Sequence, residues 1–145
     1  MPPARVAAAL AACALFTAGC SASAAEPSAT PSTSQAAPHC HQPHQASLPH
    51  SWGSLSESDS GAYCLPLGKR IDVFLTAPGR SLQRSARWST IRSSDPKVVA
   101  PTNTGVFTAP LGVTPGLFLG KAPGTAVLTS STPSGKPWTV TIVVH

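Results

Sequence analysis

The sequence predicts an all-β fold for the part of the chain that lies beyond residue 50. Short runs of β-branched and aromatic residues alternate there with breaks rich in Pro, Gly and Ser, at intervals typical of β-sandwiches. Trp88 stands near the middle of this region, where a large aromatic side chain can anchor a core. Only 10% of the residues are charged, and Pro and Gly are frequent, which favours a secreted β protein over a cytosolic helical enzyme.

The expected strands follow one another with turn residues between them, and no segment keeps a helical periodicity over about ten residues. Strands are predicted at residues 63–65, 69–75, 86–91, 98–100, 106–107, 117–119, 125–129 and 138–144. The last is the clearest, because Trp138, Val140, Ile142 and Val144 alternate with polar or smaller residues. About seven short strands around a central Trp predict an immunoglobulin-like β-sandwich over residues 51–145.

The first residues have the pattern of an export signal. Arg5 precedes an uncharged apolar run over 6–16, which is shorter than the roughly 20 residues of a transmembrane helix. The following Thr17-Ala18-Gly19-Cys20 resembles the bacterial lipobox, although Thr17 stands where Leu is usual. The resemblance implies that residues 1–19 are removed and that Cys20 carries palmitate-type acyl chains at the outer face of the cell membrane. An ordinary secretory signal that is cleaved elsewhere is the alternative.

Residues 20–50 are rich in Ser, Ala, Pro and His and have no apolar periodicity, so we expect a flexible tether. Beyond Cys20, export leaves Cys40 and Cys64 in a compartment where disulfides persist, and a bridge between them is predicted. The alternative is a free thiol that binds a metal.

That alternative involves His39, His41 and His44, which surround Cys40. Imidazole and thiolate groups suit copper and zinc, so the cluster is a candidate metal site. A His-rich linker that binds metal only weakly remains the other interpretation.

We find no nucleophile elbow, phosphate loop or zinc-protease helix, and we predict neither catalysis nor a cofactor. Asp95 precedes a proline and is expected to cap a turn, whereas Asp72 lies in mid-strand and is expected on a solvated face.

The net charge is +5, and four arginines are close together in the sequence at Arg80, Arg84, Arg87 and Arg92. Outside the cell such a group could bind anionic headgroups or wall polymers, or it could simply form a solvated face. Nucleic acid is not an expected partner, because stacking aromatics are not interleaved with these charges.

Several segments resemble known families of this fold. Bacterial immunoglobulin-like domains of surface proteins are similar at residues 68–73, 88–89, 93–99 and 123–126. Chagasin-like inhibitors of papain-type proteases are similar at residues 55–61, 67–68 and 111–118. Both resemblances imply a β-sandwich.

The inhibitor resemblance implies three loops that cross a protease cleft. The stretch 77–84 departs from the family's Asn-Pro-Thr-Thr-Gly-Tyr, and Lys136-Pro137-Trp138 is similar to its Arg-Pro-Trp, with Trp138 expected in the core. The Gly-rich loop corresponds to residues 111–116, so the candidate binding residues are Leu111, Gly112, Val113 and Gly116.

The leading hypothesis is a non-catalytic, membrane-anchored lipoprotein whose immunoglobulin-like domain binds an unknown protein or a cell-envelope polymer. The alternatives are a chagasin-like inhibitor of papain-type cysteine proteases and an extracytoplasmic lipoprotein that binds copper or zinc. The sequence leaves the oligomeric state open.

Overall fold

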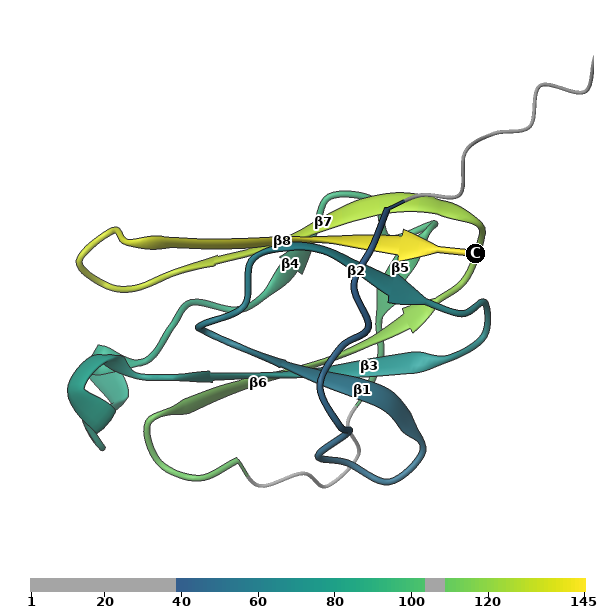
Figure 1. Ribbon diagram of the computed structural model, residues 1–145. Coiled ribbons are helices and arrows are strands. Elements are labelled where there is room, and N and C mark those ends of the chain that lie inside the picture. Colours follow the sequence, from purple (N-terminus) through teal and green to yellow (C-terminus); the bar gives the residue numbers. More distant parts are fainter. Residues whose placement is uncertain (1–38, 104–108) are drawn as a thin grey trace, which may run out of the picture. The chain divides into compact units, whose positions relative to one another are not determined.

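The computed structural model describes residues 39–103 and 109–145, which form a sandwich of two four-stranded sheets (Figure 1). The first sheet has the order β1 (Ser51–Ser56), β3 (Arg70–Thr76), β6 (Val113–Gly120) and β5 (Val99–Pro101). The second has the order β2 (Gly61–Leu65), β8 (Pro137–Val144), β7 (Gly124–Ser131) and β4 (Arg92–Ser93). The predicted all-β sandwich is confirmed. The signal peptide, Cys20, most of the tether and the strand expected at 106–107 lie outside the described residues.

The strand order is that of the immunoglobulin fold. If β1 is strand A and β3 to β8 are strands B to G, the sheets read A-B-E-D and G-F-C, with β2 added beside the last strand. Two pairings are parallel, β1 with β3 and β2 with β8, and the other pairings within the sheets are antiparallel.

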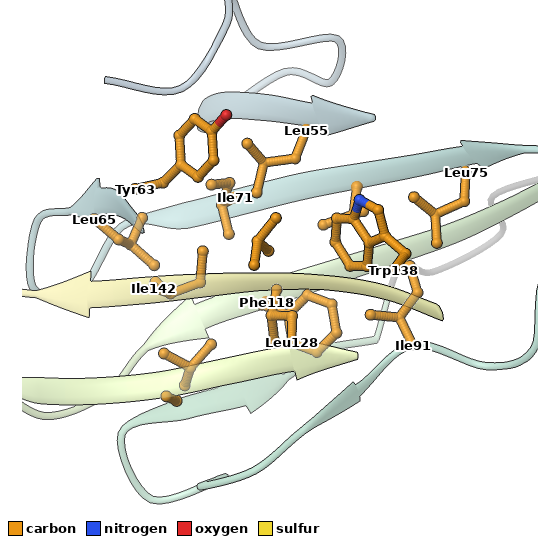
Figure 2. Packing of buried hydrophobic residues seen from close by; sticks show 14 of the residues in the cluster. Leu55, Tyr63, Leu65, Ile71, Leu75, Ile91, Phe118, Leu128, Trp138 and Ile142 are labelled. Carbon is orange, nitrogen blue, oxygen red and sulfur yellow. The ribbon is translucent and has the colours of Figure 1, made fainter. Parts of the chain in front are cut away.

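The core lies between the sheets and follows the alternation of the sequence (Figure 2). Ile71, Val73 and Leu75 are all 0% exposed, and Trp138 is only 4% exposed, as expected. Every residue of the hydrophobic cluster lies between Leu55 and Val144, so the described residues enclose a core of their own.

Trp88 is also buried, as predicted, but the strand expected around it is wrong. A 3-10 turn occupies Arg84–Ala86, and regular pairing is limited to Arg92–Ser93 of β4. Side-chain hydroxyls bind backbone carbonyls here, where a regular strand would pair with its neighbour. Thr114 Oγ1 donates to the Trp88 carbonyl at 2.8 Å, and Ser130 Oγ donates to the Ser89 carbonyl at 2.7 Å. Serine and threonine hydroxyls thus hold an irregular backbone at the sheet edge.

Residues 39–47, which were assigned to the tether, form a strap across the open edge of the sandwich, and we call them the edge strap. His41 N donates to the Ala62 carbonyl at 2.8 Å and the His41 carbonyl accepts from Cys64 N at 2.8 Å, beside β2. The His44 carbonyl accepts from Ser54 N at 3.0 Å, beside β1. Since β1 and β2 are the outer strands of their sheets on this side, the strap occupies backbone groups that an open edge would expose.

The predicted disulfide between Cys40 and Cys64 is confirmed and attaches the strap to β2. The Cα atoms are 5.1 Å apart, within the ordinary range for such bridges. The strap also explains Gly53 of β1, because a Cβ there would lie 2.7 Å from Pro43 Cβ and 2.8 Å from the His44 carbonyl oxygen.

The expectation that Asp72 lies on a solvated face is wrong, because the residue is 0% exposed. Ser47 N, at the end of the strap, donates to Asp72 Oδ2 at 3.1 Å. The strap covers a face of the sheet that the local sequence pattern left open. Among the described residues, Asp72 Oδ1 has no hydrogen-bond partner. Asp95 caps its turn as expected and accepts from Lys97 N at 2.9 Å.

Within residues 39–103 and 109–145, no helix has the length and apolar character needed to cross a bilayer.

Replacing both cysteines by serine is expected to lower the free energy of unfolding by about 3.5 kcal/mol, because the bridge closes a loop of about 25 residues in the unfolded chain. Urea unfolding of the oxidised protein and of Cys40→Ser/Cys64→Ser measures the difference. A reductant should destabilise the parent protein and leave the double variant unchanged. A difference below about 1 kcal/mol would show that the bridge contributes little to stability.

Candidate functional site

Several connections converge at one end of the sandwich, on the left of Figure 1, and we call this the loop end. It comprises the β3–β4 connection over 77–91, residues 109–112 before β6, the β7–β8 hairpin over 132–136 and the turn 57–60. Ala77 N donates to the Gly112 carbonyl at 2.7 Å, and Ser89 N donates to the Ser131 carbonyl at 2.8 Å. These hydrogen bonds attach the first connection to both of its neighbours.

A cleft of about 580 Å³ opens between these loops. Its lining residues are Glu57, Thr76, Ala77, Pro78, Gly79, Arg80, Trp88, Thr132, Ser134 and Lys136. The buried Trp88 donates its indole N–H to the Thr76 carbonyl at 2.7 Å, and Glu57 accepts from Thr76 N at 3.0 Å. The cleft is therefore polar at its rim, with both signs of charge, and has no arrangement of a nucleophile and a base among the described residues.

Two exposed leucines form the apolar part of the loop end. Leu82 is 66% exposed and Leu111 is 60% exposed. They lie on neighbouring backbone segments, because a Cβ at Gly112 would be 3.7 Å from Leu82 Cα. Gly112 has a φ of 78° and leaves no room for a side chain against the Ser81 carbonyl, which explains why glycine stands at this crossing.

The backbone of the first connection is sharply turned. Pro78–Arg80 forms a 3-10 turn in which Gly79 has a φ of 63° and Arg80 a φ of 54°. The Arg87 guanidinium donates to the Val113 carbonyl and fixes the base of the connection to β6. Leu82 is thereby presented on a loop that is supported on both sides.

The four predicted arginines differ in their exposure and in the segments that carry them. Arg80 and Arg84 are exposed on the 77–91 connection, and Arg92 is exposed on β4. Arg87 is half-buried and bonded to the backbone, which gives it a structural role.

The predicted Gly-rich binding loop is shorter than expected. Val113 begins β6, and Gly116 lies inside that strand opposite Val73. A Cβ at Gly116 would be 2.8 Å from Phe118 Cε2, so the glycine serves close packing. Of the candidate residues in this segment, Leu111 and Gly112 belong to the loop end.

The histidines of the candidate metal site are not brought together. Cys40 is in the disulfide, and His44 is bonded to Asp59. Among the residues with described positions, no group of three His, Cys, Asp or Glu side chains could hold a metal ion.

Sequence reasoning missed a buried carboxylate that shapes the turn at the loop end. Asp59 accepts from Ser56 N at 2.6 Å, from Ser56 Oγ at 2.9 Å, from Tyr63 OH at 3.0 Å and from His44 Nε2 at 2.9 Å. Burial alone raises the pKa of Asp59, but these hydrogen bonds outweigh it and hold the pKa below its ordinary value of 3.8. Burial and the adjacent carboxylate raise the pKa of the Tyr63 phenol.

Comparisons with known proteins give similarity of fold. No protein-family model matches the sequence. No curated protein matches it either. Among solved structures, the cysteine protease inhibitor EhICP2 from Entamoeba histolytica is similar, with 10% identity, a TM-score of 0.48 and coverage of 63% of this chain and 93% of the other.

Two further structures are similar in the same way. Amebosin has 12% identity and a TM-score of 0.41, over 63% of this chain and 96% of the other. Domains 4 and 5 of the S-layer protein SbsC have 15% identity and a TM-score of 0.40, over 61% of this chain and 42% of the other. Similarity at this level assigns no activity to the chain.

The lowered pKa of Asp59 predicts a loss of stability in acid. The stabilisation is fully present above the unfolded-state pKa near 3.8 and is lost as the pH falls through the lower folded-state value. Urea unfolding of the parent protein and of Asp59→Asn across this range measures the effect. Asp59→Asn should be less stable near neutral pH by about 1–3 kcal/mol and less sensitive to acid. Parallel pH profiles for the two proteins would contradict this assignment.

Proposed function

We propose that this chain is a non-catalytic binding protein, and that the loop end of its sandwich is the surface that contacts a partner protein. The observation that carries the proposal is the pair of exposed leucines, Leu82 and Leu111, on neighbouring backbone segments that hydrogen bonds hold in place. Large apolar side chains that a domain leaves exposed on supported loops are typical of contact surfaces. Supported loops also lose little conformational entropy on binding.

The specific activity that we propose is inhibition of a papain-type cysteine protease. The chagasin-like inhibitors that the sequence resembles insert three loops into a protease cleft, and the connections 77–91, 109–112 and 132–136 lie together at one end here. EhICP2, a structural neighbour, is a cysteine protease inhibitor, and this activity is transferred to the present chain only as a proposal.

The contacts would differ from those of the family in one respect. Trp138, which follows the Lys-Pro pair, is buried and donates its indole N–H to the Ser56 carbonyl at 3.0 Å. It is not available to a partner. We therefore assign the apolar contact to Leu82 and Leu111, with Lys136 at the rim.

We also propose that the protein is exported and held at the outer face of the membrane by a lipid on Cys20. The support is the sequence Thr17-Ala18-Gly19-Cys20 after an apolar run, and the disulfide between Cys40 and Cys64, a bond that persists outside the cytoplasm.

The inhibitor proposal predicts that the purified domain lowers papain activity at micromolar concentration. Leu82→Asp and Leu111→Asp should each raise the inhibition constant by about 30-fold, because each places a charge at the centre of an apolar contact. Progress curves with a fluorogenic peptide measure the constants.

Leu67→Asp is the matched control, because Leu67 is 50% exposed at the opposite end of the sandwich and should leave the inhibition constant unchanged. Absence of inhibition by the parent domain would exclude the inhibitor proposal. An equal loss in all the variants would show that the loop end is not the contact surface.

The anchoring proposal predicts that Cys20→Ala shifts the protein from the membrane fraction to the soluble exported fraction. Removal of the thiol removes the acylation site, and each acyl CH₂ in the bilayer contributes about 0.8 kcal/mol to retention. Detergent-phase partition and mass spectrometry of the N-terminal peptide provide the measurement, with Cys13→Ala as control. A parent protein whose N-terminal peptide carries no acyl chain on Cys20 would contradict the proposal.

A further inference from the structure

The end of the sandwich opposite the loop end is built from three turns that backbone hydrogen bonds join. Gly68 N donates to the Gly120 carbonyl at 2.8 Å, and Lys121 N donates to the Val98 carbonyl at 2.8 Å. The turns 66–69, 95–98 and 121–123 are therefore neighbours. We call this the entry end, because the described chain also enters the domain here.

The entry of the chain is fixed by covalent structure. Cys40 is bridged to Cys64, which pairs with Val143 close to the end of β8. Leu67 N donates to the His145 carbonyl at 2.9 Å, so the last described residue lies at the same end. A fully extended chain from Cys20 to His39 spans at most about 65 Å, so an anchor at Cys20 would put a membrane within that distance of this end.

The surface of the entry end is basic and carries one exposed leucine. Each of the three turns bears an exposed lysine, and Arg70 extends the group at the start of β3; the basic residues are Lys69, Arg70, Lys97 and Lys121. Asp95 is the acidic residue of these turns, and its carboxylate already accepts from Lys97 N at 2.9 Å. Leu67 is 50% exposed beside Lys69.

We propose that the entry end is a membrane-contacting surface that binds anionic phospholipid headgroups through these four basic side chains, with Leu67 inserted at the interface. The proposal rests on the anchoring at Cys20, which places a bilayer within reach of this end. Basic side chains around an exposed apolar residue match the headgroup and acyl layers of an anionic membrane. The same contact directs the loop end away from the bilayer, toward a partner.

The loop end also carries basic side chains, so it is the alternative membrane-binding surface. Variants at this end therefore serve as the control. Arg80, Arg84 and Lys136 are exposed there, and Arg92 is exposed on β4. The loop end, however, also carries Glu57 and lies at the far ends of the strands from the point where the chain enters. A comparison of the two ends with the same change in net charge separates a specific surface from general basicity.

The test uses the exported chain from residue 21 onward, without acyl chains, because the described residues enclose their own core. Flotation with vesicles of phosphatidylcholine, with or without phosphatidylglycerol, measures binding at low ionic strength. We expect binding to the anionic vesicles alone. Each basic side chain removed from the contact should weaken it roughly fivefold.

The entry-end variant K69E/R70E/K97E/K121E should therefore lose binding by more than about 100-fold. The matched variant R80E/R84E/R92E/K136E has the same change in net charge. It should bind the anionic vesicles within about threefold of the parent chain. Leu67→Ser, which keeps the charge, should weaken binding about fivefold through the lost apolar contact. Circular dichroism confirms that each variant is folded.

Equal losses in the two quadruple variants, or binding that Leu67→Ser leaves unchanged, would overturn the proposal. So would the absence of binding to anionic vesicles by the parent chain. These outcomes are independent of Cys20, because no acyl chain is present, so the anchoring proposal fails or stands on its own test.

Discussion

The structure depends on the closure of one open edge between its two sheets. β1 and β2 are outer strands on the same side, and the edge strap pairs with both of them. The disulfide holds the strap on β2, and Asp59 receives hydrogen bonds from the strap through His44 and from the end of β1 through Ser56. A domain of this size has a small core, and an uncovered edge would offer unpaired backbone groups to other chains. The strap pairs part of this edge and so leaves fewer backbone groups open to other chains.

The two buried tryptophans connect the core to the loop end. Their indole N–H groups donate to the carbonyls of Thr76, at the end of β3, and Ser56, at the end of β1. Each tryptophan therefore fixes the position at which a strand gives way to a loop. The same two side chains that pack in the core therefore also position the start of the 57–60 turn and of the 77–91 connection.

The parts of the fold that the sequence predicts well are those with regular alternation. The strands over 69–75 and 138–144 have one apolar face each, and pairing across the core follows. The segment 86–91 has the composition of a strand but does not pair as one, because hydroxyl groups of distant strands bind the backbone carbonyls of Trp88 and Ser89. β1 was missed because Ser-Trp-Gly-Ser-Leu-Ser has little strand character and forms a strand through its neighbours.

The sequence predicts some of the segments that form the candidate site, but not the contacts between them. Leu111 and Gly112 were predicted as binding residues. Leu82 was not, because it joins them through the contact of Gly112 with the backbone of Ser81 and Leu82, which no local sequence pattern encodes. The burial of Asp72 has the same origin, since the residues that cover it belong to the strap. The predicted cysteine pair was the one long-range contact within reach of sequence reasoning, because the expected signal peptide and lipid anchor leave Cys40 and Cys64 as the remaining cysteines.

If the chain is exported as we propose, the parallel pairing of β2 with β8 has a consequence for the order of folding events. In an exported chain both cysteines would emerge before β8, so they could be oxidised while β2 still lacks its neighbour in the sheet. The bridge would then hold the edge strap against β2 before the C-terminal strand pairs with it. The bridge would thus form before the strand pairing that is most distant in sequence among the described residues.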